Sequence, residues 1–185
     1  TVRYTSTDVE SSGVIVNLND ATAIETVGGV ETTDKILGIE NIEGSNYDDT
    51  FTTKAGETNI IEGGESATGR NELNGDTIDY SANGATKVVL NLGELNGTDY
   101  ATATVSDGNS IDLIKDIENI TGTSGEDILT GDGVKNTLIG GNSADILRGG
   151  LGADELFGGA GSDTFNEGST AIADYTGDMI DGGTE

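Results

Sequence analysis

The sequence predicts an all-β fold, a right-handed parallel β-roll or β-solenoid. Three observations lead to this prediction. Glycine recurs every nine residues over 122–166, an apolar residue recurs at the eighth place of each nine, and a longer pattern occurs twice in the chain. Periodicity of this kind is typical of repeat architectures, in which each unit buries its apolar side chains against the next. We find no convincing helical pattern of ten or more residues.

The regular units are GTSGEDILT, GDGVKNTLI, GGNSADILR, GGLGADELF and GGAGSDTFN. Their first half predicts a tight turn because glycine tolerates positive φ. Their second half predicts a short strand whose eighth-place side chain points inward. Two units then form one coil, so residues i and i+18 stack about 4.8 Å apart, the spacing of neighbouring strands. The eighth places are Leu129, Leu138, Leu147, Leu156 and Phe165.

The sixth place of each unit is the candidate metal ligand. Calcium takes oxygen ligands at about 2.3–2.6 Å, so one ion fits between two carboxylates on stacked strands. We expect Asp127, Asp145 and Asp163 in one column, and Asn136 with Asp154 in the other. Asn136 replaces an aspartate, so its site should be weaker, or Asp132 contributes to it.

Backbone carbonyls of the turns should complete each shell of ligands. The candidates are the first and third places of the five units: Gly122, Ser124, Gly131, Gly133, Gly140, Asn142, Gly149, Leu151, Gly158 and Ala160.

The pattern G-G-x-G-x-D-x-U-x over 122–166 resembles the RTX, or hemolysin-type, calcium-binding repeat. The resemblance implies a β-roll filled with several Ca²⁺ ions, on a bacterial protein exported by type I secretion. The turns GTSG and GNSA depart from it because they lack the full set of glycines. The alternative is a disordered Gly/Asp-rich linker, which gives no reason for an apolar residue at every eighth place.

Composition limits the function. The 185 residues carry 34 acidic and 8 basic side chains, a formal net charge of −26. This charge opposes compaction unless cations neutralise it, and it argues against nucleic acid as a partner. No apolar run is long enough to insert into a membrane, and we expect no Sec-type signal. Without His or Cys the common nucleophile–base pairs cannot be built, so we expect no enzymatic activity.

A longer pattern occurs twice, about seventy-six to seventy-eight positions apart. Its parts are VIVNL (14–18) and ILGIENIEGSNYDDTF (36–51), then VVLNL (88–92) and IKDIENITGTSGEDIL (114–129). We therefore divide the chain into two solenoid units, 1–76 and 77–185. Asp49 corresponds to Asp127 and becomes a further candidate ligand. The segments 21–34 and 96–110 should be surface excursions or short hairpins.

Degenerate units lie outside the regular run. In residues 52–79, between the two copies of the longer pattern, the sixth places are Asn59, Asn71 and Asp76, and the eighth places are Ile61, Leu73 and Ile78. Near the C-terminus Asp178 and Ile180 repeat the pattern, so Asp76 and Asp178 are also candidate ligands. Joining Glu185 to Thr1 gives E-T-V-R-Y-T, which aligns with 76–81. The chain is thus expected to be one repeat of a tandem array, or a subunit that stacks end to end.

The predicted function is that of an extracellular or cell-surface structural module that folds on binding calcium after secretion. It would belong to a tandem array, an adhesin, a surface layer or a fibre. The alternative is the C-terminal export and folding module of a type I-secreted enzyme, such as a protease, lipase or epimerase. A carbohydrate-active solenoid is disfavoured because aromatic and basic residues are few.

Overall fold

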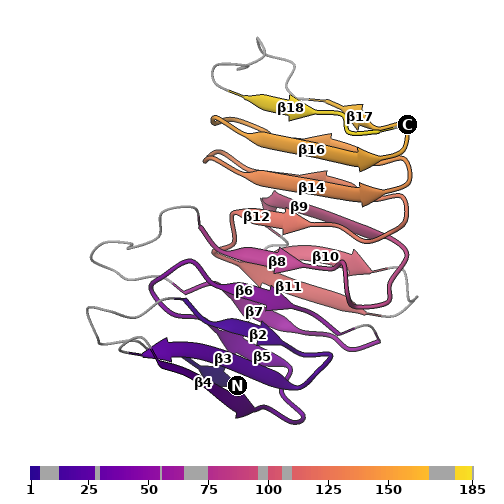
Figure 1. Cartoon of the computed structure of the whole chain (residues 1–185). Coiled ribbons are helices and arrows are strands. Elements are labelled where there is room, and N and C mark those ends of the chain that lie inside the picture. Colours follow the sequence, from indigo (N-terminus) through magenta and orange to yellow (C-terminus); the bar gives the residue numbers. More distant parts are fainter. Residues whose placement is uncertain are drawn as a thin grey trace.

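The chain folds into a stack of coils with one β-sheet on each side (Figure 1). The computed structural model describes residues 1–4, 13–27, 30–54, 56–64, 75–95, 100–105, 110–166 and 178–184. Over these ranges every regular element is a strand, and no helix is long and apolar enough to cross a membrane. The predicted sixth-place Asn71 and eighth-place Leu73 lie outside the described residues.

Each sheet has nine strands in the described part of the chain. In spatial order, the first sheet contains β1 (Val2–Arg3), β5 (Asn41–Glu43), β7 (Ile60–Glu62), β11 (Ile111–Lys115), β10 (Ala101–Val105), β9 (Val88–Leu95), β13 (Ile128–Thr130), β15 (Ile146–Arg148) and β17 (Thr164–Phe165). The second contains β18 (Met179–Asp181), β16 (Glu155–Ala160), β14 (Thr137–Asn142), β12 (Asn119–Thr121), β8 (Thr77–Asp79), β6 (Thr50–Thr52), β2 (Ile15–Asn17), β3 (Thr22–Val27) and β4 (Val30–Lys35).

The eighteen-residue register predicted for the regular run is confirmed. Leu129 pairs with Leu147 in the first sheet, and Leu138 pairs with Leu156 in the second, all in parallel strands. Successive nonapeptides therefore alternate between the sheets, and every second one stacks directly. The last coil departs from this period, because Leu156 pairs with Ile180.

Most strands pair in parallel, as the sequence predicted for a roll, but both sheets are mixed. Strands β3 and β4 pair antiparallel beyond β2, and β10 pairs antiparallel between β9 and β11. The segments after VIVNL and VVLNL thus form hairpins, one of the two predicted alternatives, but these hairpins extend the sheets. They can do so because the edge of a strand accepts either orientation of a neighbour.

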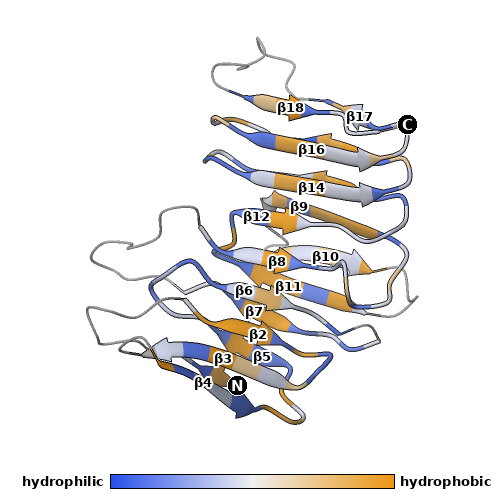
Figure 2. Cartoon of the chain, in the orientation of Figure 1, coloured by the Kyte–Doolittle hydropathy of each residue, from blue (hydrophilic) through white to orange (hydrophobic). Residues whose placement is uncertain are grey.

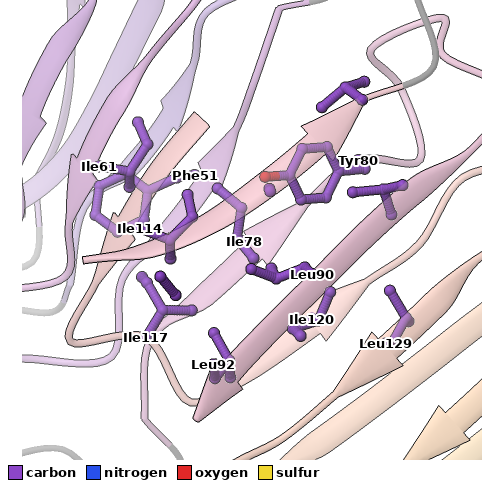
Figure 3. Packing of buried hydrophobic residues seen from close by; sticks show 14 of the residues in the cluster. Phe51, Ile61, Ile78, Tyr80, Leu90, Leu92, Ile114, Ile117, Ile120 and Leu129 are labelled. Atoms are coloured by element: carbon purple, nitrogen blue, oxygen red, sulfur yellow. The ribbon is translucent and has the colours of Figure 1, made fainter. Parts of the chain in front are cut away.

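A single line of apolar side chains fills the space between the sheets. In β7, β8, β13 and β15 the central residue is buried and its neighbours are partly exposed, because successive side chains point to opposite faces. Figure 3 shows Ile78, Leu90 and Ile120 lying together, although they come from both sheets. Figure 2 shows hydrophobic stretches mainly on the strands and hydrophilic ones in the turns and on β4. The side chains with at most 1% exposure include Val16, Phe51, Ile61, Ile78, Tyr80, Leu90, Ile114, Ile120, Leu129, Leu138, Leu147 and Leu156.

Candidate metal sites in the glycine-rich turns

The sixth-place side chains stack in two columns, one beside each sheet. In the column beside the first sheet, the backbone N–H of Asp127 donates to Oδ1 of Asp145 at 2.8 Å. The N–H of Asp145 donates in turn to Oδ1 of Asp163 at 2.9 Å. Asp127 itself accepts from the N–H of Val88 at 2.6 Å. Each carboxylate therefore reaches across to the neighbouring coil with one of its two oxygens.

The column beside the second sheet has the same construction. The backbone N–H of Asn136 donates to Oδ1 of Asp154, and that of Asp154 donates to Oδ1 of Asp178, both at 2.9 Å. Further along the stack the N–H of Asp49 donates to Oδ1 of Asp76 at 2.7 Å. All seven predicted aspartates and Asn136 thus take part in one of two ladders.

Two buried carboxylates in these ladders were not predicted as ligands. Oε2 of Glu118 accepts from the backbone N–H of Asp76 at 2.8 Å. Oδ1 of Asp112 accepts from the backbone N–H of Asn59 at 3.0 Å and from its Nδ2 at 2.8 Å. Both stand two positions before a buried isoleucine, as a sixth-place residue does. That acid-x-apolar signal, without a glycine at the first place five residues earlier, could have identified them.

Several carboxylates leave their second oxygen without a partner. Among the described residues, Oδ2 of Asp145, Asp163 and Asp178 is buried and has no hydrogen-bond donor. In Asp127 the same oxygen accepts from the N–H of Thr123 at 2.6 Å. Leaving a buried acceptor unsatisfied costs about 1–3 kcal/mol, and more when it is charged. These oxygens therefore lack the partner that a bound cation would supply.

Asn136 shows the contrasting case in the same ladder. Its Nδ2 donates to the carbonyl of Glu118 at 2.7 Å, and its Oδ1 accepts from the N–H of Asp132 at 2.9 Å. The amide thus satisfies both of its ends within the protein, and it adds no negative charge. Asp132 contacts Asn136 through its backbone N–H and not through its carboxylate. Asn136 therefore offers an ion no carboxylate oxygen, and the weaker site here stays a prediction.

Glycines of the first place bring backbone oxygens next to the carboxylates. A methyl group added at Gly122 would lie 2.5 Å from Oδ2 of Asp127 and 2.5 Å from the carbonyl oxygen of Gly140 on the next coil. The other first-place glycines, Gly131, Gly140, Gly149 and Gly158, likewise face the sixth-place side chain of their own unit. All five are buried. At Gly122, Gly131 and Gly140 a side-chain oxygen of the same unit and a carbonyl oxygen of the next coil therefore converge on the space that the glycine leaves open.

The third-place residues lie further out. Ser124, Gly133, Asn142 and Leu151 are exposed, and Ala160 is partly exposed. A methyl group added at Gly133 would meet no atom within 4 Å. The first-place carbonyls are thus placed beside the carboxylates, while the exposed third places are at the rim of the turns.

The available donors suit calcium better than other biological metals. The chain contains no His or Cys, and calcium prefers six to eight oxygens from carboxylates and carbonyls. No three carboxylates meet at one point in the part of the chain that the structure describes. An ion would therefore be held by one or two sixth-place carboxylates together with first-place carbonyls. When bound, it would supply the positive charge that the unpartnered Oδ2 atoms lack.

Burial disfavours the ionised form of two sixth-place carboxylates, those of Asp145 and Asp49, when no cation is bound. It raises the pKa of Asp145 to about 7, and the nearby charges of Asp127 and Asp163 add to the rise. Burial also raises the pKa of Asp49 to about 6, although hydrogen bonds from Val14 and Ser45 oppose it. Both values lie above the ordinary aspartate pKa of about 3.9.

These shifts predict that acid partly substitutes for calcium. A pKa raised in the folded state stabilises the fold at low pH, and this stabilisation is lost as the pH rises through about 6 and 7. In calcium-free buffer, lowering the pH from 8 to 5 should therefore increase β-structure measured by circular dichroism. The Asp145→Asn variant removes one titrating group and should show a weaker dependence. Equal β-content at both pH values would contradict the prediction.

A methyl group at Gly140 should damage one turn. It would meet Oδ2 of Asp145 and, at 2.7 Å, the carbonyl oxygen of Gly158. We expect Gly140→Ala to lower the free energy of unfolding in calcium by about 1–3 kcal/mol, because overpacking forces backbone shifts. It should also reduce the number of bound ions measured by equilibrium dialysis. The matched control is Gly133→Ala, in open space, and equal losses in both variants would contradict the assignment.

Together, the parallel coils and oxygen-lined glycine turns define a nonapeptide-repeat β-roll. The family model of the RTX calcium-binding nonapeptide repeat matches the chain in four copies over residues 134–165. The chain therefore carries RTX repeats, as the sequence predicted, and such repeats are structural calcium-binding motifs rather than catalytic ones. A search of curated proteins found no match.

Proposed function

We propose that the chain is an extracellular structural module whose β-roll folds when calcium binds, after secretion. The RTX repeats over 134–165 imply a calcium-binding structural module, and repeats of this kind are typical of secreted bacterial proteins. The observation that carries the proposal is the set of buried, unpartnered Oδ2 atoms on Asp145, Asp163 and Asp178. We assign these aspartates, with the other sixth-place residues and the first-place carbonyls, as the calcium ligands.

Repulsion between carboxylates and the loss of chain entropy both oppose folding in the absence of calcium. The net charge is −26, and each column places carboxylates on neighbouring strands. Ordering each residue also costs about 1–2 kcal/mol, which a narrow core offsets only in part. An ion between two coils neutralises two charges and holds the coils together, so binding energy becomes folding energy.

The location of the module follows from the calcium supply. Sites of extracellular modules bind calcium with dissociation constants of about 10⁻⁴–10⁻³ M. Such sites would stay empty, and the chain unfolded, at the low calcium concentration of a cytosol. The chain would then pass through a secretion channel unfolded and form its roll outside the cell.

We also propose that the chain is built from two solenoid units, 1–76 and 77–185, within a longer array, an adhesin, a surface layer or a fibre. Support comes from the equivalent places of two three-stranded sets. Strand β2 lies within VIVNL and is followed by β3 and β4, just as β9 begins with VVLNL and is followed by β10 and β11. Both sets are antiparallel, and the first strand of each pairs in parallel with a coil strand, β6 or β13.

The test is a calcium titration of the chelated protein, with β-structure and bound calcium measured on the same samples. We expect both to rise together over the millimolar range and to saturate at several ions per chain. Calcium uptake without a gain of β-structure, or folding before any ion is bound, would contradict the proposal.

A further inference from the structure

An internal junction shows how a coil docks on a hairpin. Strand β11 pairs antiparallel with β10 on one edge and parallel with β7 on the other, with Ile114 opposite Ile61. Just before this contact, Asp112 is 1% exposed and accepts two hydrogen bonds from Asn59, the sixth-place residue of the β7 coil. The outer edge of this hairpin is therefore completed by a nonapeptide-like strand.

The N-terminal hairpin has an equivalent outer strand, β4, but no counterpart of β7 pairs with it among the described residues. Asp34-Lys-Ile-Leu (34–37) corresponds to Asp112-Leu-Ile-Lys (112–115). Strand β4 pairs with β3, and among the described residues no strand pairs with its other edge. All six residues of β4 are exposed, and Leu37 is 77% exposed. Strand β4 ends at Lys35, whereas β11 continues to Lys115 where β7 supports it.

The internal junction and the N-terminal hairpin also each have a tyrosine near the corresponding aspartate. Tyr80 is fully buried, and burial followed by the charge of Asp112 raises its pKa well above the ordinary value. Tyr4 is only partly buried, and burial followed by the charge of Asp34 raises its pKa as well. The N-terminal end thus carries the residues of the internal junction in a more exposed form.

The C-terminal end carries the strands that this junction needs. Asp178-Met-Ile-Asp-Gly-Gly (178–183) matches Asn59-Ile-Ile-Glu-Gly-Gly (59–64), which contains β7. Asp163-Thr-Phe-Asn (163–166) matches Asp49-Thr-Phe-Thr (49–52), which contains β6. Met179 and Ile180 of β18 are 48% and 45% exposed. Strands β17 and β18 lie at one end of the stack and β4 at the other (Figure 1).

We propose that the C-terminal coil of one copy docks on the N-terminal hairpin and first strand of a second copy. The β7–β11 register places β18 in parallel along β4, with Met179 opposite Lys35 and Ile180 opposite Ile36. The β6–β8 register places β17 along β1, with Phe165 opposite Val2. Both sheets then continue from copy to copy. The inference rests on the proposed function, since only folded coils present these edges.

Calcium should be needed for the contact itself. Where the internal junction joins Asn59 to Asp112, the junction between copies joins Asp178 to Asp34. Asp178 brings a carboxylate whose Oδ2 is buried without a donor, instead of an amide that donates. Two carboxylates repel unless a cation lies between them.

Engineered cysteines test the register, because the chain has none of its own. The variant Lys35→Cys/Met179→Cys should give a ladder of disulfide-linked multimers on oxidation in calcium, since neighbouring strands lie within disulfide reach. Ile60→Cys/Leu113→Cys, in the same register inside the chain, should form an internal disulfide without multimers. Lys135→Cys/Met179→Cys moves one cysteine to an exposed turn residue and should give no ladder.

Circular dichroism on the same samples separates this inference from the proposed function. Protein that folds in calcium but forms no ladder at any concentration would overturn the docking inference alone. A ladder of equal yield with Lys135→Cys would overturn it too, because random collisions would explain the cross-links. Protein that stays unfolded in calcium would overturn the proposed function. In the unmodified chain, sedimentation should show mass rising with concentration in calcium, and Ile180→Lys should abolish the rise while leaving the fold.

Discussion

Chelating calcium should convert the folded roll into a largely unstructured chain. The net charge of −26 would then act without counterions bound in the turns. The Oδ2 atoms of Asp145, Asp163 and Asp178 would lose their expected partner, at about 1–3 kcal/mol each. Domains are stable by only about 5–15 kcal/mol, so a few such losses are enough to unfold a chain with a narrow core.

The measurement is far-ultraviolet circular dichroism at pH 8, first in chelator and then after calcium is restored. Two controls separate coordination from charge screening. Potassium chloride at equal ionic strength screens charges beyond about 10 Å, but it provides no divalent ion that binds in the turns. It should therefore restore little structure. Magnesium requires near-octahedral geometry and retains its waters, so it should act only weakly. A cooperative thermal unfolding transition in chelator, similar to that in calcium, would contradict the prediction.

The regular run could be predicted because its spacing encodes both the register and the core. Leu129 and Leu147 are eighteen positions apart, and two half-coils per turn place them on neighbouring strands. The hairpins carry no such spacing. In β10 the buried residues Ala101, Ala103 and Val105 alternate as in any strand, and alternation does not specify which strand lies alongside. The sequence therefore predicted surface excursions or short hairpins for these segments, but not that the hairpin strands extend both sheets.

The candidate sites were predictable to a similar extent. Asp127 and Asp145 were placed in one column because glycines mark the turns before them. Asp112 and Glu118 were missed because neither has a glycine at the first place, five residues earlier, although both are buried. The sequence also did not separate aspartates that the protein satisfies by itself from those that need an ion. That difference depends on the residue at the second place of the unit. At this place Thr123 donates hydrogen bonds to the Asp127 carboxylate from both its hydroxyl and its backbone N–H.

Truncating one core side chain should weaken the whole stack. Leu138 is fully buried in β14, between Ile120 and Leu156 on the neighbouring strands. Each coil contacts only its neighbours, so no second layer of core compensates for a cavity there. We expect Leu138→Ala to lower the free energy of unfolding in saturating calcium by about 2–5 kcal/mol, through lost burial and the cavity that remains.

The adjacent residue of the same strand supplies the control for this experiment. Ile139 points to the other face and is 37% exposed, so Ile139→Ala should cost much less. Denaturant unfolding of both variants in calcium measures the difference. Because β14 joins the coils before it to β16 and β18, the Leu138→Ala variant should also lose the C-terminal coils first, giving a broader transition. Equal costs for Leu138→Ala and Ile139→Ala would mean that the line of buried side chains does not hold the coils together.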